Sequence, residues 1–402
     1  MLGAEPFAPT PIRSPAGHAR SFGETERHLE RLLDLVPITR EYDATPLDRL
    51  GLPVWFAVTP LAADLTVHAG KGTCSQAARI SAIMEAVERT SAESVEASRV
   101  RTASYLELGG RALDPELFDL PFDTAYAPDR TCSWIRGADL LTGRDAWVAL
   151  DLVLSPAREG ICVGPETNGL AAGNEPLEAV LHAVYEVIER DAAARDRFLR
   201  RYGEGSQIPL LRIVSPEGLP PIARAWAEEL SAAGVQLTLQ NITHDVDVPV
   251  FRALLTDPGF PGREGQATRF EGLGCDLDPE RALTRAVCEA VQAHTGLLVG
   301  ARDAFEGDAG APVGRATFLE RLLAPSVVER FESGGPLPDD LAGRLALVLE
   351  RLRTTGFRHC VVVDLSRADV GIPVVRALLA GAAGPFGDTP RRPGLRLLRG
   401  LL

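Results

Sequence analysis

Lysine is almost missing from this 402-residue chain. Lys71 is its single lysine, whereas lysine and arginine together number 42. We infer that arginine replaced lysine wherever either base would serve, because arginine is planar and forked while lysine is a compact point charge. Lys71, between Gly70 and Gly72, is therefore a candidate for a role that arginine cannot fill. Drift is the alternative explanation and stays open at this point.

A basic surface is missing as well. The formal net charge is −13 and the pI is about 5.1. Proteins that hold nucleic acid by its phosphates normally carry a basic face, and the sequence has no basic stripe. Nucleic-acid binding is therefore not expected.

Long apolar runs are also missing. No run reaches the roughly 18 apolar residues that suggest a membrane-spanning helix, and the first twenty residues lack the apolar stretch of a signal peptide. We therefore expect a cytoplasmic protein without a membrane span, in which residues 1–23 form a flexible, proline-rich segment. Hydrophobic residues make up 45% of the chain, which is enough for a large core.

Paired cysteines are a further absence. The six cysteines are widely spread and none forms a C-x-x-C pair. Neither a disulfide framework nor a zinc site is expected. We interpret the cysteines as small buried hydrophobic residues in a reducing compartment.

Alternating helix and strand patterns predict an α/β fold, with mixed α+β elements in layers. Helices are expected at 24–35, 74–98, 176–200, from the turn at 276–279 to about 301, and at 314–329 and 339–354. Strands are expected at 52–59, 132–138, 147–154, 235–240, 250–255, 359–365 and 372–379. Residues 165–174 are expected to form a loop, and 305–313 and 332–340 linkers. One catalytic domain is expected at 24–385, followed by a tail at 386–402.

Three of the expected helices share a pattern in which a glutamate and, three residues later, a glutamate or glutamine enclose two apolar residues. The patterns begin at Glu85, Glu186 and Glu289, which are 101 and then 103 residues apart. This near-equal spacing indicates an ancient repeated unit. Chance similarity among alanine-rich helices is the alternative.

Each pattern places two polar side chains on one helix face, because residues i and i+3 lie about 60° apart. The pairs are Glu85 with Glu88, Glu186 with Glu189, and Glu289 with Gln292, and Glu178 joins the second face about three turns before Glu189. Apolar neighbours predict partial burial, so a positive group must neutralise these acids.

A hard divalent cation suits such a set of carboxylates, since Mg2+ binds oxygen ligands and substrate phosphates. His182 and His294 are the only nearby histidines, so a soft-metal site is not expected. For any single pair, a solvated helix face remains the alternative.

The segment from Gly70 to Thr73 is not a Walker A loop, because the first glycine is missing and Gly72 stands where serine or threonine is required. Lys71 and the N–H groups at the start of the following helix remain candidates for binding phosphate. The sequence has no G-x-S-x-G elbow, so a hydrolase with a nucleophilic serine or cysteine is a weak alternative.

Together, several segments resemble the YcaO family over about residues 40–380. The matching segments are Gly70-Lys71-Gly72, the run from Ser81 to Arg89, the run from Asn168 to Asn174 with Glu178-Ala179, the run from Glu186 to Ala192, the run from Glu289 to Gln292, and Asp364 with the run from Gly371 to Arg376. Any one of these segments alone would be a weak signal, whereas the combination is specific.

The resemblance implies a YcaO-type fold, with sheets layered around long glutamate-bearing helices and a central nucleotide site. It implies ATP and Mg2+ as cofactors, with Glu85, Glu88, Glu186 and Glu189 as the catalytic carboxylates. The implied metal ligands are Glu85, Glu88, Glu178, Glu186, Glu189 and Glu289. The implied nucleotide-binding residues are Lys71, Ser81, Asn168, Glu178, Arg190, Glu289, Gln292 and His294.

In the family, ATP phosphorylates a backbone amide oxygen, which turns a poor leaving group into a good one, and a nucleophile then displaces it. A Cys, Ser or Thr side chain gives an azoline, whereas an external sulfide gives a thioamide. The expected substrate is a ribosomally made precursor peptide or a protein.

The segments 38–40 and 47–54 look like the subgroup that pairs with TfuA-type partner proteins and is linked to thioamide formation. We therefore favour peptide thioamidation with a TfuA-like partner and a sulfide donor over azoline formation. The oligomeric state is left open between a monomer and a homodimer.

Two departures from the family pattern stand out. His294 occupies the place of a usual arginine, and it carries charge only when protonated, which questions ATP affinity. The end of the chain, from Thr389 to Leu398, is not the strict Pro-x-Pro tail that often reaches the active site in azoline-forming members. A non-catalytic YcaO-like scaffold and an unrelated ATP-dependent ligase or kinase remain as alternatives.

Overall fold

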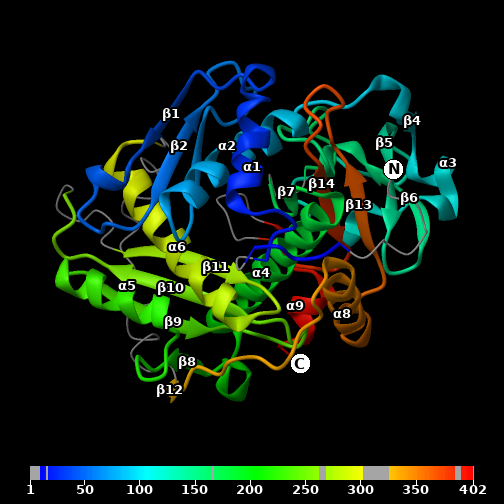
Figure 1. Cartoon of the computed structure of the whole chain (residues 1–402). Helices are drawn as coiled ribbons and strands as arrows, with labels where there is room; N and C mark the ends of the chain where they lie inside the picture. Colours follow the sequence, from blue (N-terminus) through cyan, green and yellow to red (C-terminus); the bar gives the residue numbers. More distant parts are fainter. Residues whose placement is uncertain are drawn as a thin grey trace.

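The structure is a computed structural model that describes residues 10–14, 17–163, 167–261, 269–301, 326–384 and 391–401. These residues form three sheets with long helices between them (Figure 1). The predicted mixed α/β class is therefore confirmed. In the described part of the chain, every helix is too short or too polar to cross a lipid bilayer.

The three sheets differ in size. The first is an antiparallel sheet with the order β1 (Arg40–Asp43), β2 (Val54–Val58), β3 (Val67–Lys71). The second has the order β11 (Arg269–Cys275), β10 (Val250–Thr256), β9 (Gln236–Asn241), β8 (Leu211–Val214), β12 (Ser326–Glu329). The third has the order β4 (Val100–Ala103), β5 (Cys132–Asp139), β13 (Cys360–Asp364), β14 (Val374–Leu379), β7 (Leu170–Ala172), with β6 (Arg144–Ala149) also paired to β5.

Eight α-helices lie in the described residues. They are α1 (Phe22–Glu30), α2 (Ser75–Ala92), α3 (Tyr105–Leu108), α4 (Pro176–Tyr202), α5 (Pro221–Ala232), α6 (Pro279–Leu298), α8 (Leu341–Thr354) and α9 (Leu395–Arg399). Local sequence fixes several of their starts. Ser21 and Glu24 form a capping box at α1, and Pro176 occupies the first turn of α4, where its missing N–H costs nothing.

Most of the predicted elements are confirmed, with four kinds of difference. The helix predicted at 74–98 ends at Ala92, and the strand predicted at 147–154 gives way to a short 3-10 turn after Ala149. The helix predicted at 314–329 is wrong at its end, since 326–329 form β12 in parallel pairing with β8. Its other residues and the linker at 305–313 lie outside the described residues. The loop predicted at 165–174 contains the short strand β7, and strands β1, β3, β4, β8 and β11 and helices α3, α5 and α9 were not predicted.

The three glutamate-bearing helices occupy equivalent places. Each packs on the strand that precedes it and also contacts the edge strand of a neighbouring sheet. Helix α2 packs on β3 and contacts β7, α4 packs on β7 and β14 and contacts β11, and α6 packs on β11 and contacts β3. The three units therefore close into a ring, and α2, α4 and α6 meet at the centre of the molecule (Figure 1).

Glycine permits the close approach of strand and helix in two of the three units. A Cβ added at Gly70 would lie 2.0 Å from the backbone oxygen of Ala78, and one added at Gly274 would lie 2.0 Å from that of Ala282. Both glycines stand fifteen residues before the leading glutamate of the next helix. The shared spacing and packing support the repeated unit that the sequence suggested.

Candidate active site

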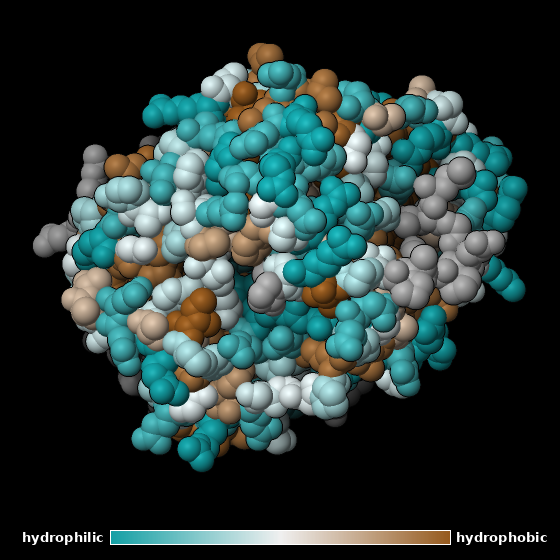
Figure 2. Space-filling view, viewed as in Figure 1, coloured by the Kyte–Doolittle hydropathy of each residue, from teal (hydrophilic) through white to brown (hydrophobic). Residues whose placement is uncertain are grey.

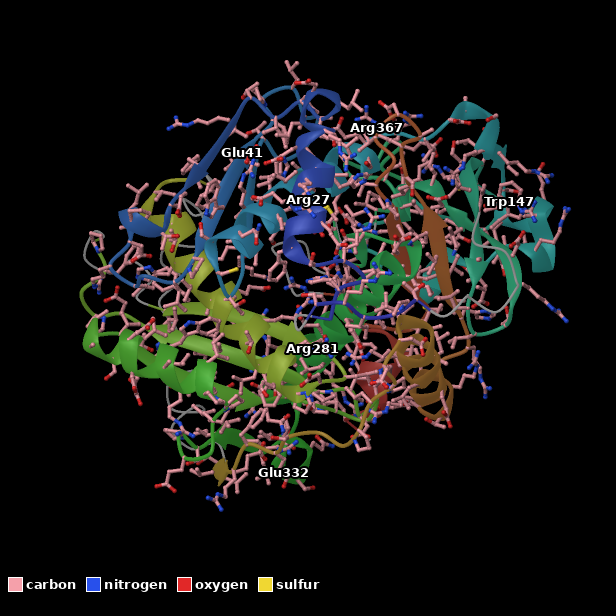
Figure 3. All side chains as sticks on the ribbon, in the orientation of Figure 1. Arg27, Glu41, Trp147, Arg281, Glu332 and Arg367 are labelled. Carbon is pink, nitrogen blue, oxygen red and sulfur yellow. The ribbon has the colours of Figure 1, made fainter. Side chains whose placement is uncertain are left out.

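A cavity of about 1100 Å3 lies where α2, α4 and α6 meet. Figure 2 shows a hydrophilic recess near the centre of the viewed face. Figure 3 labels Arg281, one of the lining residues, at the N-terminal end of α6. The volume is at the upper end of the range for small-molecule and cofactor sites.

The cavity is lined at equivalent positions of the three helices. Counted along α2, α4 and α6, the lining sets are Ala77, Glu178 and Arg281; Ser81, His182 and Arg285; Glu85, Glu186 and Glu289; Glu88, Glu189 and Gln292; and Arg89, Arg190 and Ala293. The register is the spacing of the sequence repeat, so the ring places one polar stripe from each helix against the same space.

Ten of the twelve predicted site residues line this cavity. They are Lys71, Ser81, Glu85, Glu88, Glu178, Glu186, Glu189, Arg190, Glu289 and Gln292. Asn168 is not among the lining residues, although its neighbour Thr167 is. The amide oxygen Oδ1 of Asn168 is buried and has no hydrogen-bond partner among the described residues.

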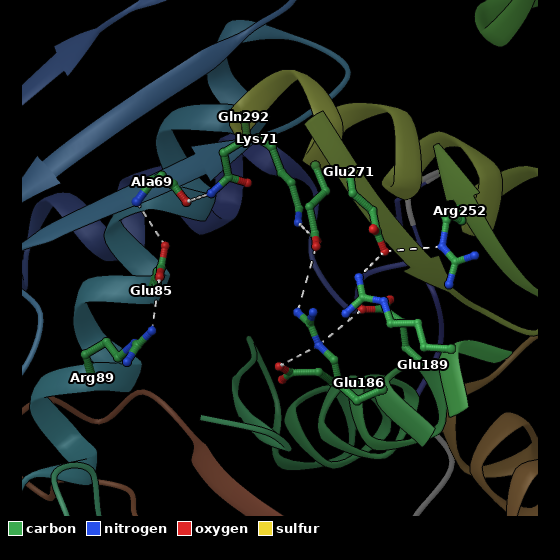
Figure 4. Close-up of polar contacts among 12 residues, drawn as sticks. Ala69, Lys71, Glu85, Arg89, Glu186, Glu189, Arg252, Glu271 and Gln292 are labelled. Atoms are coloured by element: carbon green, nitrogen blue, oxygen red, sulfur yellow. Dashed lines mark hydrogen bonds and ion pairs between the residues drawn. The ribbon is translucent and has the colours of Figure 1, made fainter. Parts of the chain in front are cut away.

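Cations hold the carboxylates at the acidic end of the cavity (Figure 4). Lys71 Nζ donates to Glu289 Oε2. Arg190 lies 3.8 Å from Glu289, 3.7 Å from Glu189 and 3.9 Å from Glu186, so one guanidinium links two helices. Lys71 therefore ends the strand β3 with its charge at the acidic cluster.

Edge strands fix the orientation of the polar side chains. The Ala69 N–H of β3 donates to Glu85 Oε2 at 2.9 Å, and the Ala172 N–H of β7 donates to Glu88 Oε1 at 2.8 Å. Gln292 Nε2 donates to the Ala69 carbonyl oxygen at 2.9 Å. These bonds use backbone groups that an edge strand leaves unpaired, and they preorganise the site.

The surroundings shift the pKa values of the acids in opposite directions. Burial raises the pKa of Glu88 to about 8, and the neighbouring carboxylates Glu85 and Glu186 add to the effect. Burial likewise raises the pKa of Glu189 to about 7, and it raises the pKa of Glu186. Burial opposes ionisation of Glu289 too, but Lys71 and Arg190 outweigh it and lower its pKa to about 2. The cavity thus contains both protonated and ionised carboxyl groups near neutral pH.

Glu178 is held by the N-terminal segment. It is 2% exposed, accepts from His18 Nδ1 at 3.0 Å and from the Ala19 N–H at 2.8 Å, and accepts from Asn174 Nδ2 at 2.9 Å. Although burial opposes ionisation, the contact with His18 lowers the pKa of Glu178 to about 2. Residues 17–23 therefore pack beside the cavity, which the prediction of a flexible lead-in did not anticipate.

The donor set fits Mg2+ by its chemistry. All six predicted metal ligands line one space, and Mg2+ prefers oxygen ligands. The raised pKa values of Glu88 and Glu189 indicate that these acids lack enough positive charge around them. Among the described residues, no three candidate ligands already stand in metal-binding geometry.

His294 is a correction to the predicted nucleotide site. Its side chain is 0% exposed and lies outside the cavity lining. Its Nδ1 is 2.7 Å from Asp48 and its Nε2 is 2.9 Å from Asp257, so both ring nitrogens are occupied by carboxylates. The helix turn carries position 294 away from the face of Glu289, and the residue bridges structural acids.

Several lining residues were not predicted as site residues. Arg89, Arg281 and Arg285 bring three guanidinium groups to the cavity wall, and His182 lines it as well. Burial lowers the pKa of His182 to about 3, so this histidine is neutral. The spacing of the repeat could have predicted them. Each stands at a position of its helix that corresponds to a lining residue on another of the three helices.

Comparisons with known proteins identify the family. A family model described as YcaO cyclodehydratase, ATP- and Mg2+-binding, matches residues 69–383. A protein of Methanothermobacter thermautotrophicus is 32% identical over 404 residues, covering 95% of this chain and 97% of that protein. A protein of Rhizobium leguminosarum bv. trifolii, described by its place in the tfuA 3′ region, is 30% identical over 380 residues, covering 90% and 87%.

Solved structures give the same result. YcaO from Methanopyrus kandleri, bound with AMPPCP and Mg2+, is 25% identical with a TM-score of 0.72, covering 95% of this chain and 99% of that one. A heterocyclase in complex with substrate and cofactor has a TM-score of 0.79 at 19% identity; the match covers 96% of this chain but 56% of the heterocyclase, and supports the fold alone. By its family model, its relatives and its fold, the chain belongs to the YcaO family, as its sequence motifs predicted.

Proposed function

We propose that this protein uses ATP and Mg2+ to phosphorylate a backbone amide oxygen of a peptide or protein, and that sulfide then converts the amide into a thioamide. The observation that carries the ATP- and Mg2+-dependent step is a cavity lined by nine carboxylates, one lysine and four arginines at the centre of a YcaO fold. In this family a solved structure holds AMPPCP and Mg2+.

The residues divide the work as follows. Bound Mg2+ would stabilise charge on the transferring phosphoryl group. Lys71 and Arg190 contact Glu289, and when ATP binds they would contact its phosphate oxygens in place of that carboxylate. Glu85 and Glu88, which accept backbone N–H groups of β3 and β7, would hold Mg2+. Ser81 and Gln292 line the cavity and would contact the nucleotide, whereas Asn168 lies next to the lining residue Thr167.

The chemistry proceeds in two steps. The amide oxygen attacks the γ-phosphorus of ATP and ADP leaves. Hydrosulfide then forms a bond to the carbonyl carbon, the carbon–oxygen bond breaks, and hydrogen phosphate leaves with the sulfhydryl proton. Each step is a displacement without net oxidation or reduction.

Two observations favour thioamide over azoline. The Rhizobium relative is described by its place beside tfuA, which supports a TfuA-like partner. The described tail residues 391–401 pack elsewhere: Leu397 contacts Phe198 and Leu199 at the end of α4, and none of residues 391–401 lines the cavity. Azoline formation from Cys, Ser or Thr remains the second candidate, since the phosphorylation step is shared.

The test is mass spectrometry of a candidate precursor peptide incubated with this protein, ATP, Mg2+, sulfide and a TfuA-like partner. A thioamide gains the mass difference between sulfur and oxygen, whereas an azoline loses one water. Glu186→Gln, which keeps the side-chain volume, should give unmodified peptide, and the exposed acid Glu228 of α5 provides the matched control Glu228→Gln. Water loss would establish azoline formation, and unmodified peptide with the wild type would refute the proposed reaction.

A further inference from the structure

Arg89 lines the main cavity near the C-terminal end of α2. It follows Glu88 as Arg190 follows Glu189, so the two arginines stand at equivalent positions of two repeated units. In the third unit the equivalent residue is Ala293. The ring of three units therefore brings two guanidinium groups to the cavity from different helices.

The two arginines have different partners. Arg190 lies within 3.9 Å of three carboxylates of the acidic cluster on α4 and α6. Arg89 instead pairs with an acid that does not line the cavity: its Nη1 donates to Asp64 Oδ2 at 3.0 Å, in the loop between β2 and β3. Figure 4 shows Arg89 and Glu85 on the opposite side of the view from Glu189.

Asp64 holds Arg89 without using up its donors. A guanidinium carries five N–H groups in a fixed fork, and among the described residues the hydrogen bond of Arg89 is the one to Asp64. Its Nη2 lies 3.8 Å from Glu85, beyond hydrogen-bond distance. Asp64 is itself fixed by the Ser155 hydroxyl at 2.8 Å. Arg89, 15% exposed, is therefore oriented from outside the cavity while most of its donors remain available.

The neighbouring acids leave the charge of Arg89 available as well. Burial raises the pKa of Glu88 to about 8, so near neutral pH this group is largely protonated and does not neutralise the guanidinium. Glu85 accepts from the Ala69 N–H at 2.9 Å. A charged guanidinium with available donors at the wall of a polar cavity suits the oxygens of a phosphoryl group, which it can contact through two parallel N–H bonds.

We propose that Arg89 is a further catalytic residue, which donates to the oxygens of the phosphoryl group as that group passes from ATP to the amide. The proposal rests on the ATP-dependent step of the proposed function and holds for a thioamide or an azoline product. The amide oxygen forms a bond to the γ-phosphorus, the bond from that phosphorus to the bridging oxygen breaks, and its electron pair leaves with ADP. Arg89 keeps its proton and stabilises the charge on the transferring oxygens.

Substitution of Arg89 should separate turnover from binding. Arg89→Ala should lower kcat for peptide-dependent ATP turnover about 100- to 1,000-fold, and Arg89→Lys, which keeps the charge but not the fork, should recover only part of this loss. Calorimetric binding of a non-hydrolysable ATP analogue with Mg2+ should stay close to the wild-type value, since the contact forms in the transition state. Added guanidinium should restore part of the turnover of Arg89→Ala, a recovery that a merely structural role would not give.

The control and a second test use residues outside the cavity lining. Arg101, an exposed arginine of β4, provides the matched control Arg101→Ala, which should keep the wild-type kcat. Asp64→Asn weakens the hold on Arg89 and should lower kcat about tenfold at unchanged nucleotide affinity. The double variant of Asp64→Asn and Arg89→Ala should be no slower than Arg89→Ala alone, because Asp64 is a positioning residue that acts through Arg89.

The outcomes separate this proposal from the proposed function. If the wild type modifies the peptide and Arg89→Ala keeps the wild-type kcat, Arg89 is not catalytic and the proposed function stands. If Arg89→Ala weakens nucleotide binding at an unchanged kcat, Arg89 is a ground-state ligand of ATP and the proposal is overturned. If the wild type binds the analogue but consumes no ATP with the peptide, both proposals fail. Should Arg89→Ala not fold, an unchanged kcat in Asp64→Asn refutes the role of Arg89.

Discussion

Glu88 and Glu289 line the same cavity, yet replacing each with glutamine should change stability in opposite directions. The folded-state pKa of Glu88 is raised from 4.5 to about 8 by burial, so the folded protein binds the extra proton between those two pH values. Stability from this group is therefore fully present below about pH 4.5 and is lost as the pH rises through about 8. Glu88→Gln keeps the neutral form at every pH and removes that loss.

The size of the effect follows from the pKa shift. One pKa unit corresponds to 1.36 kcal/mol, so a shift of about 3.5 units sets an upper limit of about 5 kcal/mol. Water entry and side-chain relaxation in an open cavity reduce it, and we expect about 1–2 kcal/mol at pH 8.5. In metal-free buffer Glu88→Gln should therefore melt a few degrees above the wild type at pH 8.5 and at the same temperature near pH 5.

Glu289 provides the matched comparison. Lys71 and Arg190 overcome burial and lower its pKa to about 2, so its stabilising contribution is present above about pH 4.5 and is lost only as the pH falls through about 2. Glu289→Gln should lower the melting temperature throughout pH 5–8.5, because Lys71 loses the carboxylate that it contacts and Arg190 loses one of three. Thermal denaturation by circular dichroism, in the presence of a chelator, measures both variants.

The refuting result is specific. If both variants shift the melting temperature in the same direction, or if the difference for Glu88→Gln does not grow from pH 5 to pH 8.5, the opposite charge states inferred for these two acids are wrong. Adding Mg2+ and a non-hydrolysable nucleotide should stabilise the wild type more than Glu88→Gln, since a ligand stabilises the form that binds it.

Three further predictions follow from the site. Lys71→Arg should reduce ATP turnover about tenfold or more despite the kept charge, because a forked guanidinium does not fit the place of a point charge; wild-type turnover would favour drift. Glu186→Gln should abolish ATP turnover while thermal melting shows a folded protein, and retained turnover would remove this carboxylate from the catalytic set. His294→Ala should destabilise the protein by about 3–5 kcal/mol in denaturant unfolding, because Asp48 and Asp257 lose the partner between them. The pH dependence of nucleotide binding should not change. A changed pH profile with unchanged stability would restore the phosphate role of His294.

The sequence by itself determined much of the site. Helical spacing placed the acids of each pair on one face, and this local geometry needs no tertiary information. The combination of Lys71, the glutamate pairs and the Asn-Gly loop identified the family. The repeat spacing was also readable, and it is the same register that lines the cavity.

Tertiary structure decided which faces meet and which partners each side chain finds. The three helices meet because each contacts the edge strand of a neighbouring sheet, a long-range pairing that leaves no local signal. A long-range contact also explains β12. Its parallel partner β8 lies more than a hundred residues earlier in the chain, so the local pattern alone favoured a helix there.

His294 illustrates the limit most clearly. It stands five residues after Glu289 on the same helix, and sequence placed both in one site. The five-residue step rotates the side chain to another face of α6, and the acids that receive it, Asp48 and Asp257, come from distant segments. Sequence fixes the angle between neighbouring side chains on a helix, whereas only the packed fold decides whether that angle points into the cavity or into the core.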